Sequence, residues 1–506
     1  MSTVWGVNVG THDSSIASVV DGELVFAAHS ERSSRKKNDR LLHPTTVQQA
    51  LSISGEPDKI VFYERDKWKR VRQLWAGQYR TALTKPDVRS LIPIVDTMPI
   101  EDTVYTHIPS VSVAHHHSHA AAGYYTSPYT DAAVLVVDSI GEWETLTVWK
   151  GEGRKLKRVY SQGYPHSVGL WYSAMTQRIG LKPNEDEYIL MGWAALGDPD
   201  KYKKRIYDDF FKPLKPGNAG VRFRENLHRG CLTWAPELNT PQDYADIAAG
   251  TQAVYEHVFK HLINETKRLV NSNNLVVMGG CALNCVANSI AHREYNGNVW
   301  IMPNPGDAGS SLGAVLAYQQ DFIEWTGPYQ GYNIKGEYPV TDLFKQLKST
   351  GLVGVANGKA EFGPRALGNR SLLADPRGTN VKDRVNTVKR RQEFRPFAPV
   401  ILESDASDYF DGPVGPYMQY TSVCKQPELF PAIAHYDNTS RVQTVNQKEH
   451  PGLFKLLTEW KKRTGCPMLL NTSLNIKGEP MVDTEADAER WQEQYNVPVF
   501  TKENEQ

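Results

Sequence analysis

The sequence has little cysteine. Five cysteines among 506 residues give no disulfide framework. Cys281 and Cys285 lie four residues apart, but no second pair follows them, so we interpret them as buried small residues and not as half of a thiolate metal site. A reducing, cytoplasmic setting is the one we expect.

The sequence also lacks an excess of charge and long apolar runs. Lys plus Arg and Asp plus Glu both number 57. Without a global basic field we do not expect a nucleic-acid polymer as partner, although a local basic cleft remains open. The apolar run from Val134 to Val137 is far shorter than a membrane span, and the first five residues do not resemble a signal peptide, so we expect no membrane association.

A histidine cluster is the most informative stretch. Residues 114–122 read AHHHSHAAA and are predicted to enter a helix. His115 and His119 are four apart, so on a helix both rings lie on one face and reach one cation. Asp138, which ends an apolar run, and Asp307, in a glycine turn, are the best candidates for the remaining ligands. The spacing predicts a metal site; the alternative is a cluster of exposed or hydrogen-bonded histidines.

One pattern of strand, polar loop and hairpin occurs twice. Strands are predicted at 3–9, 15–20 and 24–28, and again at 132–138, 145–149 and 156–160. With a length that exceeds one hydrophobic core, this duplication predicts an α/β fold with two pseudo-symmetric lobes, the layout of the actin-like ATPase superfamily.

Glycine turns mark candidate anion sites. A long helix is predicted from Pro241 to Asn271, and the strand at 275–278 then runs into Gly279-Gly280. The stretch from Gly306 to Gly313 repeats that design. Such turns at the start of a helix present backbone N–H groups to phosphate, although many glycine turns only reverse the chain.

The composition changes near residue 330. Glycine and proline accumulate between 322 and 339, so we predict domains at 1–335 and 336–506. Beyond this boundary, basic residues lie among Gly, Pro and Phe at 358–371, 389–396 and 440–443, and Asn471, Ser473 and Asn475 alternate onto one face of a strand. These groups suit phosphoryl and carboxylate ligands; the alternative is a solvated basic surface.

Together the motifs resemble the O-carbamoyltransferases of the nodulation and antibiotic-tailoring type, from Gly6 to about Ala486. The matching stretches are THDS at 11–14, HHHSHAA at 115–121, MG at 191–192, GGCALNC at 279–285, GDAG at 306–309, EFGPRALGNR at 361–370, RPFAP at 395–399 and NTS at 471–473. The sequence departs from the family pattern at Glu187–Leu190, where relatives have lysine, and at Gln392-Glu393, where they have Glu-Pro.

The resemblance implies a two-step reaction. The first domain of this family is similar to the transferase subunit of tRNA threonylcarbamoyl-adenosine synthesis. The resemblance implies that this domain holds one metal, Fe(II), through His115, His119, Asp138 and Asp307. The second domain of the family is YrdC-like, and the resemblance implies that it uses carbamoyl phosphate and ATP, with Mg²⁺, to make carbamoyl-adenylate. The first domain then passes the carbamoyl group to a substrate hydroxyl.

Site residues follow from these steps. Cations and donors that we expect to bind ATP and carbamoyl phosphate are Arg365, Arg370, Lys389, Arg391, Arg395, Arg441, Asn471, Ser473 and Asn475. Adenylate in the first domain is expected at Gly279, Gly280, Asn284 and Gly306. His12, beside Asp13, is the candidate base for the acceptor hydroxyl, because the ordinary histidine pKa lies near operating pH. The alternative for His12 is a hydrogen bond that fixes its loop.

The sequence leaves the acceptor open. A small molecule, a sugar or a modified nucleotide are candidates, and a homodimer is a candidate assembly. A nucleotide-binding regulatory protein on an actin-like scaffold is one alternative function, against which the complete ligand set argues. A tRNA-modifying carbamoyl transferase is another, weakened by the lack of a basic stripe.

Overall fold

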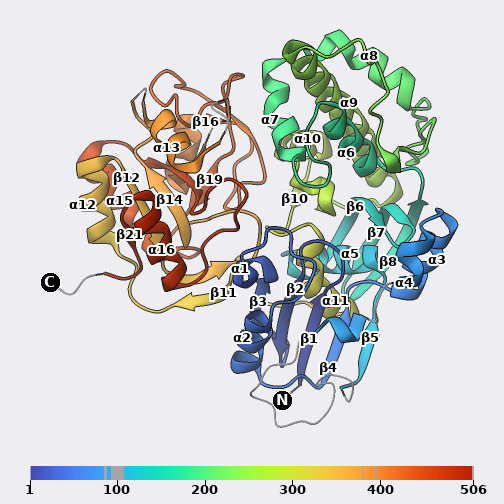
Figure 1. Cartoon of the computed structure of the whole chain (residues 1–506), viewed down its shortest axis with the longest axis horizontal. Coiled ribbons are helices and arrows are strands. Elements are labelled where there is room, and N and C mark those ends of the chain that lie inside the picture. Colours follow the sequence, from blue (N-terminus) through green and yellow to red (C-terminus); the bar gives the residue numbers. More distant parts are fainter. Residues whose placement is uncertain are drawn as a thin grey trace. The chain divides into compact units, whose positions relative to one another are not determined.

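The structure is a computed structural model that describes residues 2–84, 88–92, 108–378, 380–391, 394–395 and 397–503 (Figure 1). Its contacts divide the chain into unit 1, made of Met1–Ile60, Val88–Pro109 and Glu324–Gln506, and unit 2, made of Val61–Asp87 and Ser110–Ile323. Gln392 and Glu393 lie outside the described residues, and the domain boundary at 335/336 stays a prediction. Among the described residues, no helix has the length and apolar character needed to cross a membrane.

Two five-stranded sheets share one topology. The first has the strand order β3-β2-β1-β4-β5, and the second, taken from its opposite edge, has β8-β7-β6-β9-β10. In each, three consecutive antiparallel strands are followed by two strands from later in the chain. The predicted duplication and α/β class are therefore confirmed. The strands are β1 Thr3–Asn8, β2 Ser15–Val20, β3 Glu23–His29, β4 Lys59–Phe62, β5 Ser110–Ser112, β6 Asp131–Gly141, β7 Glu144–Glu152, β8 Lys155–Gly163, β9 Asn274–Met278 and β10 Asn298–Trp300.

Strand β6 is the central strand of unit 2. Its residues from Ala132 to Val137 are completely buried, as expected for an apolar run covered on both faces. It pairs parallel to β9 and antiparallel to β7, and the pairing with β7 is interrupted between Val137 and Gly141. Asp138 lies in this interruption, directly after the buried run, and has no regularly paired residue opposite it on β7.

Helices of unit 2 surround this sheet. The long helix α9 (Pro241–Leu269) begins with proline and a capping box between Thr240 and Asp243, which confirms the predicted helix. Helices α5 (His115–Thr126) and α11 (Ser310–Gln319) pack closely, because Gly313 lies against the Ser118 carbonyl. The other helices are α3 Asp66–Trp75, α4 Tyr79–Thr84, α6 Val168–Arg178, α7 Glu187–Trp193, η2 Ala194–Leu196, α8 Pro199–Phe210, η3 Leu227–Arg229, η4 Gly280–Leu283, α10 Cys285–Tyr295 and η5 Asp307–Gly309.

Unit 1 contains a six-stranded mixed sheet of order β19-β15-β20-β14-β12-β21. Its apolar core includes Leu453, Leu457 and Trp460 of helix α15. The strands of this region are β11 Tyr329–Ile334, β12 Leu352–Ala356, β13 Gly358–Glu361, β14 Arg370–Ala374, β15 Ala398–Leu402, β16 Phe410–Asp411, β17 Ser422–Cys424, β18 Thr439–Ser440, β19 Gln443–Val445, β20 Met468–Ser473 and β21 Val499–Phe500. The helices of unit 1 are α1 Ser30–Ser34, α2 Pro44–Ser54, η1 Val88–Leu91, α12 Val340–Thr350, α13 Val381–Lys389, η6 Glu403–Asp405, α14 Ala406–Tyr409, α15 Pro451–Thr464 and α16 Glu485–Tyr495.

Two arginines join the beginning and the end of the chain within unit 1. Arg32, on α1, donates to the carbonyls of Glu361 at 3.4 Å and Gly363 at 3.0 Å. Arg35, just after α1, donates to the carbonyls of Pro480 at 2.9 Å and Met481 at 2.6 Å. The first sixty residues therefore complete the C-terminal part of the same unit.

Candidate functional site

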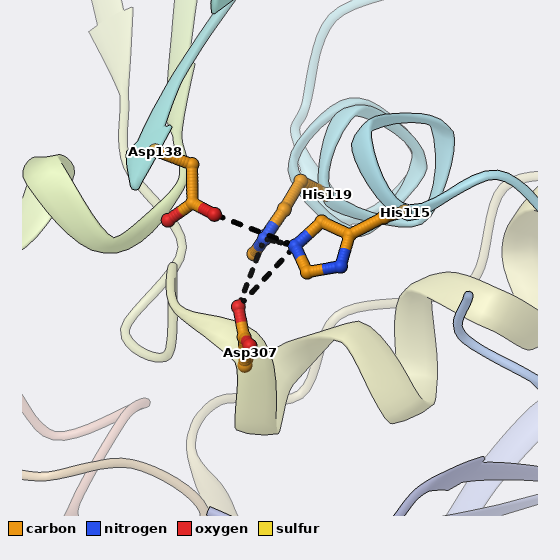
Figure 2. Close-up of side chains that lie close together, drawn as sticks. All are labelled: His115, His119, Asp138 and Asp307. Carbon is orange, nitrogen blue, oxygen red and sulfur yellow. Dashed lines mark hydrogen bonds and ion pairs between the residues drawn. The ribbon is translucent and has the colours of Figure 1, made fainter. Parts of the chain in front are cut away.

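Four side chains from unit 2, three of them buried and that of Asp307 partly buried, meet at one point (Figure 2). His115 and His119 lie on one face of α5, Asp138 lies in the interruption of β6, and Asp307 starts η5. One ligand atom from each of the four lies within 4.8 Å of the others. The structure thus brings together the four residues predicted from spacing.

The separations within this cluster suit a common cation. The two Nε2 atoms of His115 and His119 are 3.1 Å apart. The His115 Nε2 lies 3.4 Å from Asp138 Oδ2 and 3.4 Å from Asp307 Oδ1, which in turn lies 3.3 Å from His119 Nε2. Bonds of about 2.0–2.2 Å to a central metal place neighbouring ligand atoms about 3.0–3.6 Å apart in octahedral or tetrahedral geometry. The donor set and its spacing therefore fit one divalent metal.

A second layer of groups orients these donors. Ser310 Oγ lies 3.1 Å from His119 Nδ1, and the backbone N–H of Gly280 donates to Asp138 Oδ1 at 3.0 Å. On the far side of the His115 ring, Glu64 Oε2 lies 3.6 Å from Nδ1. Each of these groups contacts the nitrogen or oxygen of the donor side chain that faces away from the centre of the cluster. The lone pairs that face the centre therefore stay free for a metal.

The cluster favours positive charge. Burial lowers the pKa of His115, but the charge of Asp307 and the contacts with Asp138, Asp307 and Glu64 outweigh it and raise that pKa well above its ordinary value. Burial raises the pKa of Asp138, and its contact with His115 more than reverses that effect, so this carboxyl stays ionised. A proton or a divalent cation supplies the charge that this arrangement favours.

The two other histidines of the motif differ. Burial, aided by His115 and His119, lowers the pKa of His116 well below its ordinary value, and His116 Nδ1 lies 3.0 Å from Thr147 Oγ1. His117 stacks on Trp149, and burial lowers its pKa to about 4. Neither belongs to the four-residue cluster.

The predicted glycine turns border the cluster. Gly279 has φ +92°, and a Cβ there would lie 2.2 Å from the Val137 carbonyl oxygen, so only glycine fits this approach to β6. Asn284 caps α10 by accepting from Ala287 N at 3.1 Å, and its amide exchanges hydrogen bonds with Gln252. Gly306 caps η5, immediately before Asp307. Adenylate binding at these residues stays a prediction.

His12 and Asp13 contact each other in unit 1. His12 Nδ1 lies 2.8 Å from Asp13 Oδ2, and about half of the His12 side chain is exposed. Asp13 has φ +59°, and its carbonyl accepts from Asn8 Nδ2 at 2.9 Å. The contact agrees with both predictions for His12, a base oriented by a carboxylate and a residue that fixes the loop.

Lys389 contacts two of the other predicted nucleotide-site residues in unit 1. Its buried ammonium donates to Ser473 Oγ at 3.0 Å, to Asn475 Oδ1 at 2.6 Å and to the Ser473 carbonyl. Burial, then the charges of Arg391 and Arg395, lower its pKa well below the ordinary value. Asn471 and Ser473 lie two apart on β20, as predicted, but the strand ends at Ser473, so Asn475 lies beyond it and the prediction that all three share one strand was wrong.

The remaining predicted arginines have different surroundings. The Arg391 guanidinium lies 3.9 Å from the Phe397 ring centroid and donates to the Arg395 carbonyl at 2.8 Å. Arg365 and Arg441 are half-buried. Among the described residues, Arg441 Nε has no hydrogen-bond partner, and the same holds for Asn471 Oδ1. Both atoms are therefore available to a bound group.

Arg370 serves the backbone. It is completely buried, and its guanidinium donates to five backbone carbonyls. These belong to Tyr332, Asn357, Gly358, Asn369 and Asp483. The structure therefore gives Arg370 a structural role, and its contact with a nucleotide stays a prediction.

Sequence reasoning missed two buried carboxylates around His115. Glu64 follows the buried strand β4 and accepts from Lys69 Nζ at 2.6 Å. Glu142 lies near the start of α5, where its Oε1 is 3.4 Å from His115 N, and it accepts from Arg65 N at 2.7 Å. An acid at the end of an apolar run is the signal that identified Asp138, and Glu64, two residues after the end of β4, offers a similar signal.

Comparisons with known proteins agree over most of the chain. The family model described as Carbamoyltransferase N-terminus matches residues 3–316, and the one described as Carbamoyltransferase C-terminus matches residues 344–504. Uncharacterized protein sll1178 of Synechocystis sp. is 33% identical over 97% of this chain and 94% of its own length. Nodulation protein NolO of Bradyrhizobium diazoefficiens is 31% identical over 74% of this chain and 75% of its own.

Among solved structures, the activator of the 2-hydroxyisocaproyl-CoA dehydratase from Clostridium difficile is 12% identical, with a TM-score of 0.33 over 63% of this chain and 95% of that chain. The two family models and the relative with 33% identity are sufficient, and they show that this chain belongs to the carbamoyltransferase family of transferase enzymes.

Proposed function

We propose that this protein is an ATP-dependent O-carbamoyltransferase that works in two steps. In the first, water converts carbamoyl phosphate into carbamate and phosphate, and a carbamate oxygen then attacks the α-phosphorus of ATP, with Mg²⁺, to give carbamoyl-adenylate with pyrophosphate as the leaving group, at residues of the C-terminal part. In the second, a hydroxyl of the acceptor attacks the carbamoyl carbon and AMP leaves. The observation that carries the proposal is the buried cluster of His115, His119, Asp138 and Asp307 within a chain of the carbamoyltransferase family.

The cluster supports a resident divalent metal, which we propose to be Fe(II). Two imidazole nitrogens and two carboxylates form a donor set that Fe(II) accepts, and their spacing fits bonds of about 2.0–2.2 Å. When bound, such a metal supplies a Lewis acid at the carbamoyl oxygen or the phosphate. The protein holds the donors in place through Gly280 N–H and Ser310 Oγ.

The surroundings of Lys389 support adenylate formation. Lys389, Arg391 and Arg395 are close enough for the two arginines to lower the lysine pKa, and a bound phosphate relieves this repulsion. Oxygen acceptors of Ser473 and Asn475 hold the lysine amine in place. Arg365 and Arg441, with the unpartnered Arg441 Nε, are further candidates for contact with phosphate or carbamoyl groups.

Backbone donors and a base support the transfer step. The glycine turns at Gly279-Gly280 and Gly306 are candidates for holding the adenylate, with Asn284 as a neighbouring polar group. We propose that His12 removes the proton from the acceptor hydroxyl, with Asp13 orienting the imidazole through the contact at Nδ1. The acceptor is a hydroxyl-bearing small molecule, sugar or modified nucleotide.

The test is carbamoyl-phosphate-dependent exchange of pyrophosphate into ATP. It is run on the iron-reconstituted protein and on a His115→Ala/His119→Ala variant. Exchange in both proteins supports adenylate formation without the metal, and transfer to hydroxyl acceptors is then screened with the two proteins. Absence of exchange in both, in samples that bind ATP, contradicts the carbamoyl-adenylate route. Uptake of metal and ATP without exchange identifies a nucleotide-binding regulatory protein instead.

A further inference from the structure

We propose that Glu64 is a positioning residue for His115. It fixes the ring in the orientation and tautomer that direct Nε2 toward Asp138, Asp307 and His119. This inference rests on the proposed function, because it assigns His115 a metal to hold. It concerns a residue that lies 51 positions before His115 in the sequence and has no place in the four-residue cluster.

The first observation is the environment of His115 Nδ1. This nitrogen is buried and has no hydrogen-bond partner among the described residues, while Glu64 Oε2 lies 3.6 Å from it. A charge-assisted hydrogen bond requires about 2.7–2.9 Å, so a movement of less than about 1 Å completes the contact. With a proton on Nδ1, the lone pair of Nε2 points to the shared site, as in other carboxylate–histidine–metal arrangements.

The second observation is that Glu64 is itself held. Both Glu64 and its partner Lys69 are buried, and Lys69 Nζ donates to Glu64 Oε1 at 2.6 Å. Lys69 lies on α3, where the side chains of Lys69 and Arg72 are buried while those of Trp68 and Trp75 are more than half exposed. A buried ammonium needs an acidic partner, because burial without one is strongly destabilising, and Glu64 is the acidic partner of Lys69.

The third observation is the confinement of the ring. Tyr63 packs against it with ring centroids 5.1 Å apart, and a Cβ on Gly141 would lie 2.2 Å from His115 Cδ2. The backbone N–H of His115 donates to Glu142 Oε1 at 3.4 Å. Packing against Tyr63 and Gly141 therefore sets the plane of the His115 ring, and Glu142 holds the first residue of α5. Glu64 is then the group that determines which ring nitrogen of His115 carries the proton.

The test uses two variants and one matched control. Glu64→Gln removes the charge at similar volume, and Lys69→Met leaves Glu64 in place without the ammonium that holds it. The control is Asp246→Asn, because Asp246 is an equally buried carboxylate of unit 2 whose hydrogen bonds within the described part of the chain go to Lys201 Nζ, at 2.7 Å, and to other groups outside the four donors. Dissociation constants for Fe(II) and Co(II) are measured anaerobically by chelator competition, together with the Co(II) visible spectrum and thermal unfolding of the metal-free proteins.

We expect Glu64→Gln to weaken metal binding 10- to 100-fold and to change the Co(II) spectrum, and Asp246→Asn to leave both unchanged. A Glu64→Gln protein that is less stable but binds metal like the wild type would overturn the inference. If Glu64→Gln does not fold, Lys69→Met decides, and unchanged affinity in that variant would equally overturn it. A wild-type protein that binds no metal stoichiometrically contradicts the proposed metal site itself, which distinguishes the two failures.

Discussion

A single methyl group at Gly313 tests whether the packing of α5 on α11 sets the metal site. A Cβ at this position would lie 2.0 Å from the Ser118 carbonyl oxygen and 2.9 Å from Ala122 Cβ. Since carbon and oxygen atoms rarely approach closer than about 3.3 Å, Gly313→Ala forces the two helices apart by about 1 Å. Helix α5 carries His119, and α11 directly follows the short helix that begins with Asp307.

This displacement is large for a coordination site. His119 Nε2 and Asp307 Oδ1 are now 3.3 Å apart, whereas distances to a metal tolerate a change of about 0.2 Å. We therefore expect Gly313→Ala to lower the affinity for Fe(II) or Co(II) by at least about 100-fold. Overpacking destabilises the protein by about 1–3 kcal/mol, offset in part by about 1 kcal/mol from the better helix propensity of alanine.

Gly197 provides the matched control. A Cβ there would lie 2.1 Å from the Ala245 carbonyl oxygen of α9, a helix that carries none of the four donors, and Gly197 has an ordinary φ of −107°. Gly197→Ala should therefore lower the thermal unfolding temperature without weakening metal binding. Unchanged metal affinity in Gly313→Ala, measured by chelator competition, would refute the idea that this helix contact sets the site.

Three further predictions concern other parts of the protein. His12→Asn should preserve pyrophosphate exchange and stop carbamoyl transfer, whereas equal loss of both would make His12 structural. Lys389→Met should reduce exchange by about 100-fold or more, and exchange at the wild-type rate would remove Lys389 from the site. Burial lowers the pKa of His450 to about 4; its neutral ring accepts from Leu453 N and contacts Asn369 Oδ1. Because the folded pKa is below the unfolded value of 6.5, this stabilisation is present above pH 6.5 and lost as the pH falls toward 4. It amounts to about 3 kcal/mol. Thermal unfolding of His450→Asn should depend less on pH in this range than that of the wild type, and an identical dependence would contradict the assignment.

Local patterns were sufficient to predict the four donors of the cluster. The i, i+4 spacing of His115 and His119 specifies one helix face, and a buried apolar run fixes where Asp138 emerges. The duplicated order of strands was readable for the same reason, because strand and hairpin signals depend on neighbouring residues.

Groups that depend on contacts distant in sequence were not predictable. The position of Glu64 after a buried apolar run marks it as a candidate, but nothing local in residues 63–69 indicates that its partner is His115, since only the packing of α3 and β4 creates the contact. The EFGPRALGNR stretch shows a second limit. An arginine among glycines can bind a phosphate or donate to buried backbone carbonyls, and the sequence does not distinguish the two. In the structure Arg370 donates to backbone carbonyls.

The contact of Arg35 with the carbonyl of Met481 has a consequence for biosynthesis. These residues are 446 positions apart. At about 5–20 residues per second, a ribosome needs roughly 20 to 90 s to travel from one to the other. During that interval the carbonyl acceptors of Arg32, at Glu361 and Gly363, are made first, and those of Arg35, at Pro480 and Met481, come last. The contacts of Arg35 within unit 1 therefore form only after residue 481 has been made, and a stop codon before residue 480 leaves Arg35 without these two acceptors.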